Sequence, residues 1–173
     1  MAGAKTSGQT RIWVAPRPGV PDHLGAMGST FYSLRYHVVF STKLRRPLIR
    51  PAWRPHLHEY LGGTIRGLEG VAEMVGGVED HVHLLLSLKT TVAPADVVRE
   101  LKKASSNWAA DNHERTFAWQ EGYSIFSVSW THAGLVRDYI AAQEQHHSRL
   151  PFIEELKRLL QKNGVRYDPK YLE

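Results

Sequence analysis

The spacing of apolar residues changes along this chain in an order that constrains the fold more than any single motif does. Between Tyr32 and Phe40, apolar and polar residues alternate, which predicts a half-buried strand. Residues 52–68 carry apolar residues at helical spacing, and residues 71–78 and 81–88 then predict two short strands. A second helix is predicted to begin at Pro94, and a fourth strand covers residues 123–130.

Two further helices are predicted over residues 132–149 and 151–162, the last one before the helix-ending pair Asn163-Gly164. The order strand, helix, strand, strand, helix, strand favours an α+β fold. We expect a ferredoxin-like or RRM-like four-stranded, mainly antiparallel sheet with helices on one face, plus C-terminal helices. Such a sheet leaves its other face free for a ligand.

Three segments are expected along the chain. Residues 1–28 are rich in Gly and Pro and show no hydrophobic period, so we expect a disordered leader, or a start-site artefact if translation begins at Met27. Residues 29–150 are expected to form the main domain, and residues 151–173 a C-terminal helix and tail.

Composition narrows the possible classes of function. The chain has 173 residues, of which 42% are hydrophobic and 23% charged, as is ordinary for a globular protein. It has no cysteine, which excludes disulfides and thiolate zinc sites. No apolar run approaches the ~18 residues of a membrane span, so we expect a cytoplasmic protein. The formal charge of +5 suits a polyanionic partner such as nucleic acid.

The stretch EDHVHLLLSL places two histidines inside an apolar run. On a strand, residues i and i+2 point to the same face, so His81 and His83 project together while Val82 and Leu84 point into the core. Two imidazoles on a rigid strand are two thirds of a catalytic metal site. The alternative is two separate surface histidines, each bonded to water or to a backbone carbonyl.

A second candidate pair lies in the helix predicted over residues 132–149. Tyr139 and Gln143 are four residues apart and therefore share one helical face. The glutamine oxygen suits a hard divalent cation, whereas the tyrosine could equally be an ordinary core residue. Together with the histidines, this set fits transesterification at a phosphodiester. Mg²⁺ or Mn²⁺ would polarise the phosphate and stabilise the leaving 3′-oxygen, while the tyrosine hydroxyl attacks.

Five ordered motifs resemble one known family. They are LRYHVVFSTKLRRPLI, EDHVHLLLSL, LKKASSNW, FAWQEGYSIFSVS and VRDYIAAQEQHH. Together they resemble the HUH single-tyrosine transposases of the smallest bacterial insertion sequences, to which the REP-associated tyrosine transposases are closely related. The resemblance runs from about residue 31 to residue 172.

The resemblance implies a role for each candidate residue. His81 and His83 would bind the metal, Mg²⁺ or Mn²⁺, and Gln143 would complete its site. Tyr139 would be the nucleophile and form a 5′-phosphotyrosine link to DNA. Glu79 or Asp80, just before the histidines, is a weaker candidate for an assisting acidic residue.

The resemblance also implies partners. The substrate would be single-stranded DNA at element ends flanked by hairpins, which is cleaved and rejoined. The protein would be a homodimer whose sheets join at an edge, and in many members the tyrosine helix of one subunit completes the site of the other. A non-mobile, domesticated relative that mainly binds hairpin DNA is the alternative.

Basic residues indicate where DNA would bind. The turn after the first strand holds Lys43, Arg45, Arg46 and Arg50, which could neutralise phosphates. In the second predicted helix Lys102, Lys103, Ser105 and Ser106 could line further backbone, with Trp108 or Trp119 as a stacking surface. The alternative is a solvated basic face with tryptophans in the core.

Three other functions compete with this interpretation. A non-catalytic nucleic-acid-binding module need not keep both histidines together with Tyr139 and Gln143. A histidine phosphoesterase with an H-x-H-x-H motif would need a third histidine where Leu85 stands, and enzymes with two H-x-[ST] motifs also match poorly. A structural zinc site lacks ligands in a chain without cysteine.

Overall fold

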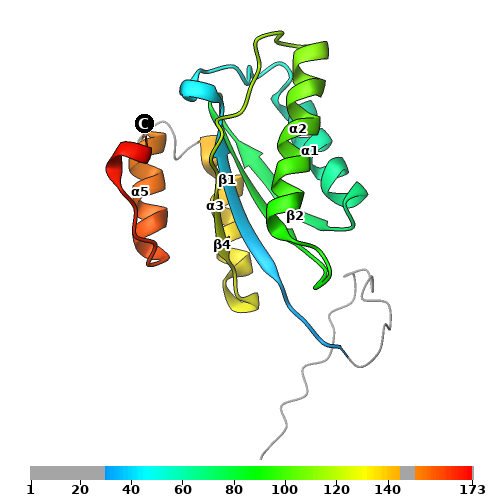
Figure 1. Ribbon diagram of the computed structural model, residues 1–173, viewed down its shortest axis with the longest axis vertical. Coiled ribbons are helices and arrows are strands. Elements are labelled where there is room, and N and C mark those ends of the chain that lie inside the picture. Colours follow the sequence, from blue (N-terminus) through cyan, green and yellow to red (C-terminus); the bar gives the residue numbers. More distant parts are fainter. Residues whose placement is uncertain (1–29, 145–150, 173) are drawn as a thin grey trace, which may run out of the picture. The chain divides into compact units, whose positions relative to one another are not determined.

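Four strands pair into one antiparallel sheet, in the order β2-β3-β1-β4. The computed structural model describes residues 30–144 and 151–172. The strands are β1 (Arg35–Ser41), β2 (Val71–Gly77), β3 (His81–Ser87) and β4 (Ser124–Ser127) (Figure 1). This is the predicted four-stranded fold. The leader expected over residues 1–28 and residues 145–149 of the predicted third helix lie outside the described residues.

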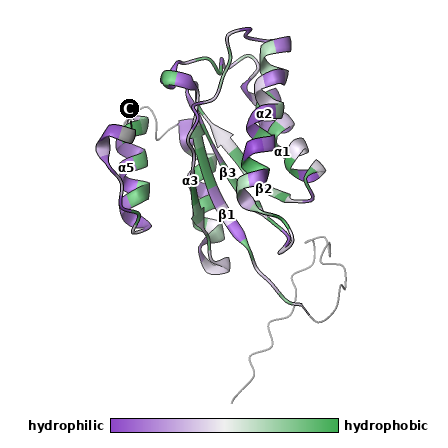
Figure 2. Ribbon diagram, in the orientation of Figure 1, coloured by the Kyte–Doolittle hydropathy of each residue, from purple (hydrophilic) through white to green (hydrophobic). Residues whose placement is uncertain are grey.

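Helices α1 (Arg54–Gly67) and α2 (Pro94–Asn112) cover one face of the sheet (Figure 1). Both begin with proline in the first turn, where the missing N–H has no intrahelical partner to lose. Apolar residues of both helices pack with the core-facing residues of the two central strands, β1 and β3. Figure 2 shows these strands largely in the green of hydrophobic residues. This main core includes Val38, Phe40, Val82, Leu84, Leu86, Leu57, Leu61, Ile65, Val97 and Leu101.

The opposite face is also covered, so β1 and β3 are buried on both faces. Helix α3 (Ala133–Ala141) packs on β2 and β3 through a second apolar cluster that includes Leu85 and Ile140. Helix α5 (Phe152–Lys162) reaches the same face, where the Phe152 ring stacks on His81. The sequence predicts a half-buried first strand and a free second face, and the structure differs because the C-terminal helices fill that face.

A short 3-10 turn makes the fourth strand shorter than the sequence predicts. The expected fourth strand ends at Ser127, because the chain then enters the turn η2 (Trp130–His132), which the Ser129 hydroxyl closes on the His132 ring at 2.8 Å. Two other turns are η1 (Lys43–Arg45) and η3 (Pro169–Tyr171). Among the described residues, no helix is both long and apolar enough to cross a membrane.

Candidate active site

The two histidines of β3 point together toward the face that α3 and α5 cover. Both side chains are fully buried, while Val82 and Leu84 point into the main core. Each ring has a partner on its Nδ1 atom. His81 Nδ1 lies 2.7 Å from the Asp80 carboxylate, and His83 Nδ1 lies 2.9 Å from Nε2 of His37 on β1. Both Nε2 atoms are therefore left facing the same space.

A glycine lets the tyrosine helix approach these histidines. Gly76 on β2 pairs with His83, and a Cβ placed there would lie 2.6 Å from the backbone oxygen of Ile140 on α3. Any side chain at this position would push α3 away from the sheet. The close approach sets the Tyr139 ring edge-on to His83, with ring centroids 5.7 Å apart.

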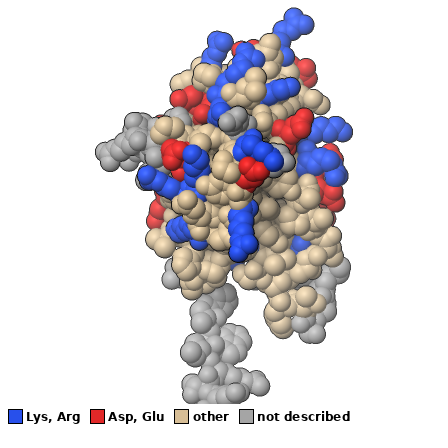
Figure 3. Space-filling view, turned by 60° about the vertical axis from the view of Figure 1, so that its left-hand side comes forward, with Lys and Arg blue, Asp and Glu red and all other residues tan. Residues whose placement is uncertain are grey.

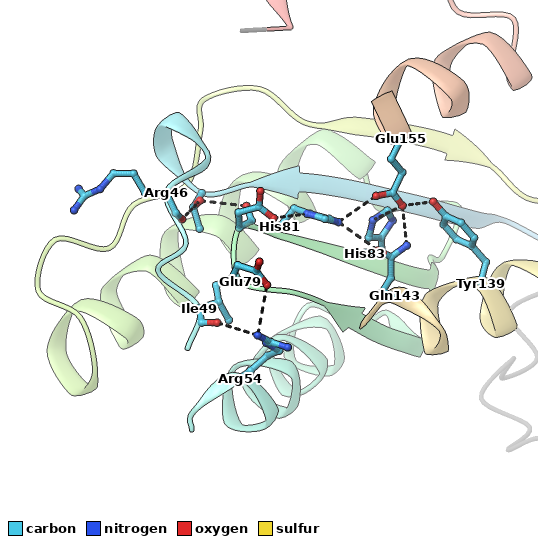
Figure 4. A network of polar contacts seen from close by, with 11 residues as sticks. Arg46, Ile49, Arg54, Glu79, His81, His83, Tyr139, Gln143 and Glu155 are labelled. Atoms are coloured by element: carbon cyan, nitrogen blue, oxygen red, sulfur yellow. Dashed lines mark hydrogen bonds and ion pairs between the residues drawn. The ribbon is translucent and has the colours of Figure 1, made fainter. Parts of the chain in front are cut away.

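Gln143 follows one turn after Tyr139, just beyond the end of α3, and is buried. Its side-chain oxygen lies 3.3 Å from His81 Nε2. The structure therefore brings together the four residues singled out from the sequence, His81, His83, Tyr139 and Gln143, and it does so within one chain (Figure 4).

A fifth residue that the sequence reasoning missed, Glu155 on α5, lies at the centre of this group (Figure 4). The carboxylate is buried and accepts hydrogen bonds from the Tyr139 hydroxyl and, at 2.8 Å, from the amide of Gln143. Its two oxygens each lie 3.4 Å from Nε2 of one histidine, His81 or His83. A signal did exist, because Glu155 follows Phe152 by three residues and so lies on the apolar stripe of its helix.

Charge is unevenly distributed within the site. Burial opposes protonation of His81, but the Asp80 and Glu155 carboxylates outweigh burial and raise the pKa of His81 to about 9. Burial alone would raise the pKa of Glu155, yet its contacts with the histidines and Tyr139 hold it well below its usual range. Burial and the adjacent carboxylate raise the pKa of Tyr139 well above its ordinary value. Without a further positive charge, Tyr139 therefore stays protonated.

The donor set fits a divalent cation. One ligand atom each from His81, His83 and Glu155 lies within 4.8 Å of the others, and the Gln143 oxygen adjoins them. His83 Nε2 is a buried nitrogen without a hydrogen-bond partner among the described residues, as expected of an atom that serves as a ligand. Mixed imidazole and carboxylate donors suit a transition metal such as Mn²⁺ and are compatible with Mg²⁺.

The two acidic residues proposed to assist have separate positions. Asp80 holds His81, as described above, in the carboxylate–histidine arrangement that orients metal ligands. Glu79 instead lies 3.8 Å from the guanidinium of Arg54.

The residues predicted to bind DNA are placed in two regions, and their roles stay predictions. Lys43, Arg46 and Arg50 are exposed around η1, whereas Arg45 donates to the backbone oxygen of Leu172. On the face shown in Figure 3, Lys and Arg side chains gather over the upper half, with Asp and Glu among them. Positive and negative side chains are therefore interspersed on that face and do not form one continuous basic patch in this view.

The second region, on α2, contains side chains with structural partners. The Lys102 ammonium donates to the backbone oxygens of Gln120, Glu121 and Gly122, whereas Lys103 is exposed. Ser105 and Trp119 are buried and hydrogen-bonded to each other, at 2.9 Å. Trp119 therefore belongs to the core and offers no stacking surface.

The chain is similar to known proteins in both its sequence and its fold. Residues 30–143 match the family model described as IS200-like transposase. A candidate transposase from Deinococcus radiodurans R1 superposes with a TM-score of 0.56 at 23% identity, over 67% of this chain and 95% of that one. A REP-associated tyrosine transposase bound to a REP hairpin superposes with a TM-score of 0.54 at 15% identity, over 72% of this chain and 76% of that one. No curated protein sequence matches the chain significantly.

Proposed function

The chain belongs to the family of IS200-like transposases, and we propose that it cleaves and rejoins single-stranded DNA through a covalent link to Tyr139. It would act as a metal-dependent single-strand endonuclease and strand transferase at hairpin-flanked ends. The observation that carries this proposal is the convergence of Tyr139 with His81, His83 and Gln143 on one buried point.

Each residue has a defined part in the proposed reaction. His81 and His83 would hold a divalent cation through their Nε2 atoms, with the cation displacing the proton of His81, and Gln143 and Glu155 would be oxygen donors. When bound, Mg²⁺ or Mn²⁺ supplies the positive charge that polarises the scissile phosphate and stabilises the leaving oxygen. The Tyr139 oxygen forms a bond to phosphorus as the bond to the 3′-oxygen breaks. Reversal by another 3′-hydroxyl rejoins the strand.

The electrostatics of the site support a requirement for the cation. The Glu155 carboxylate contacts the tyrosine hydroxyl and raises the pKa of Tyr139, so the metal-free site disfavours the phenolate nucleophile. A positive charge bound beside Glu155 counteracts this effect. We therefore expect little cleavage in the presence of a chelator.

Hairpin DNA is the proposed substrate because the solved REP-associated relative holds a REP hairpin. Lys43, Arg46 and Arg50 would contact its phosphates beside the end of β1. A homodimer joined at a sheet edge is part of the proposal, and β2 and β4 are the outer strands available for it.

The test is adduct formation on DNA. Labelled single-stranded hairpin DNA from the flanks of the gene is incubated with Mg²⁺ or Mn²⁺, and covalent products are separated on a denaturing gel. We expect a metal-dependent adduct that Tyr139→Phe abolishes and Tyr123→Phe, at a partly exposed tyrosine outside the site, retains. Tight hairpin binding without an adduct would instead favour a domesticated DNA-binding protein.

A further inference from the structure

We propose that His37 is a positioning residue that fixes the tautomer of His83, so that the lone pair of His83 Nε2 faces the cation. This inference rests on the proposed metal site. It assigns a role to a β1 side chain that the reaction itself does not use.

His37 makes a buried, closely packed contact with His83. Its side chain is 4% exposed, and its Nε2 atom lies 2.9 Å from His83 Nδ1. The two rings are stacked, with centroids 5.2 Å apart and planes 28° from parallel. Phe126 and Tyr139 close around the His37 ring, each with a centroid 6.1 Å away. Neither imidazole can turn away without disturbing this packing.

The hydrogen bond decides which nitrogen of His83 carries the proton. A neutral imidazole has one N–H and one lone pair, so His83 can ligate through Nε2 only when Nδ1 is protonated. His37 Nε2 is then the acceptor, and the His37 proton resides on its own Nδ1. In that arrangement His37 Nε2 carries a lone pair aimed at the His83 Nδ1–H, 2.9 Å away.

The two metal histidines thus have different supports. His81 donates to the Asp80 carboxylate, whereas His83 is expected to donate to a neutral ring. A second carboxylate in place of His37 would add another buried negative charge beside Glu155. An aliphatic residue would leave the His83 Nδ1–H buried without a partner, which is unfavourable in a protein interior. A buried histidine supplies an acceptor for the His83 Nδ1–H and adds no negative charge.

Direct metal binding tests this role without depending on DNA cleavage. Mn²⁺ titration by calorimetry compares the wild type with His37→Phe, which keeps a stacked ring but has no acceptor, and His37→Gln, which keeps an acceptor oxygen. We expect His37→Phe to bind Mn²⁺ about 10- to 100-fold more weakly and His37→Gln to recover part of the loss. His58→Phe removes a partly buried imidazole on α1, outside the site, and should bind like the wild type. Equal affinity of His37→Phe and wild type would overturn the inference.

Nitrogen NMR of histidine-labelled, metal-free protein separates this inference from the proposed function. We expect His83 in the Nδ1–H form in the wild type and a changed His83 signal in His37→Phe. An Nε2–H form of His83 in the wild type would overturn the inference even if the metal bound. If the wild type bound no Mn²⁺, the proposed function would lose its cation, while the spectra would still decide the hydrogen bond between His37 and His83.

Discussion

Arg54 Nη1 donates to Glu144 Oε1 at 2.7 Å, which joins the first turn of α1 to the residue after Gln143. The guanidinium is buried and also lies 3.4 Å from the backbone oxygen of Ile49. The chain end of α3 is therefore held by a helix on the other side of the sheet. Because Gln143 precedes Glu144 directly, this contact restricts where its side-chain oxygen can lie.

Substitution Arg54→Met should both destabilise the fold and loosen the site. We expect a loss of about 1–3 kcal/mol in the free energy of unfolding, because the buried backbone oxygen of Ile49 loses its charged donor. Glu144→Gln should cost less than about 1 kcal/mol, since the Glu144 side chain is 74% exposed. Urea unfolding measures both variants. If the two variants were equally stable, Arg54 would have no anchoring role beyond its surface ion pair.

Mixing experiments should show that each chain uses its own tyrosine, because Tyr139 lies beside the histidines of the same chain. The Tyr139→Phe and His81→Ala proteins, each expected to be inactive alone, carry tags of different size and are refolded together and incubated with hairpin DNA. We expect no adduct in the mixture. An adduct on the His81→Ala chain would mean that its tyrosine helix serves a partner's histidines.

Lys102 and Lys103 should respond differently to substitution although both were predicted to bind DNA. Lys102→Met removes the donor for three backbone oxygens before β4, and we expect it to lower the free energy of unfolding by about 1–3 kcal/mol. Lys103→Met should leave stability unchanged and weaken hairpin binding, with a smaller salt dependence. Thermal unfolding and binding titrations at two salt concentrations check both. If Lys102→Met instead weakened only hairpin binding and Lys103→Met lowered stability, Lys102 would be the DNA-binding residue and Lys103 the structural one.

Local periodicity predicts which residues of the candidate site share a face, but not what surrounds them. The i, i+2 spacing of His81 and His83 and the i, i+4 spacing of Tyr139 and Gln143 determine which side chains share a face. Glu155 was missed because its partners come from elements distant in sequence, and only packing of α5 on the sheet brings them together.

His37 was missed for a related reason. It alternates with apolar neighbours on β1 and therefore looks like a solvent-facing residue of a half-buried strand. That interpretation assumes an open second face. The approach of α3, which Gly76 permits, buries the face and turns a polar position into an interior one. Alternation alone does not reveal whether a second layer will cover the polar side of a strand.

Acidification should destabilise the fold through His58 on α1, outside the site. Burial, and to a lesser extent the charge of Arg54, lower the pKa of His58 from 6.5 to about 4, with Glu144 opposing. In the unfolded chain, His58 binds a proton as the pH falls below 6.5, whereas in the folded chain it stays neutral down to about pH 4. The free energy of unfolding therefore falls as the pH drops from 6.5 to 4. The loss of unfolding free energy from His58 alone should approach about 3 kcal/mol near pH 4.

Urea unfolding measured from pH 7 to pH 4 tests this role. The free energy of unfolding should decline less steeply for His58→Phe, while His56→Gln, at an exposed position of the same helix, follows the wild type. Parallel curves for His58→Phe and the wild type would show that His58 is not the group responsible.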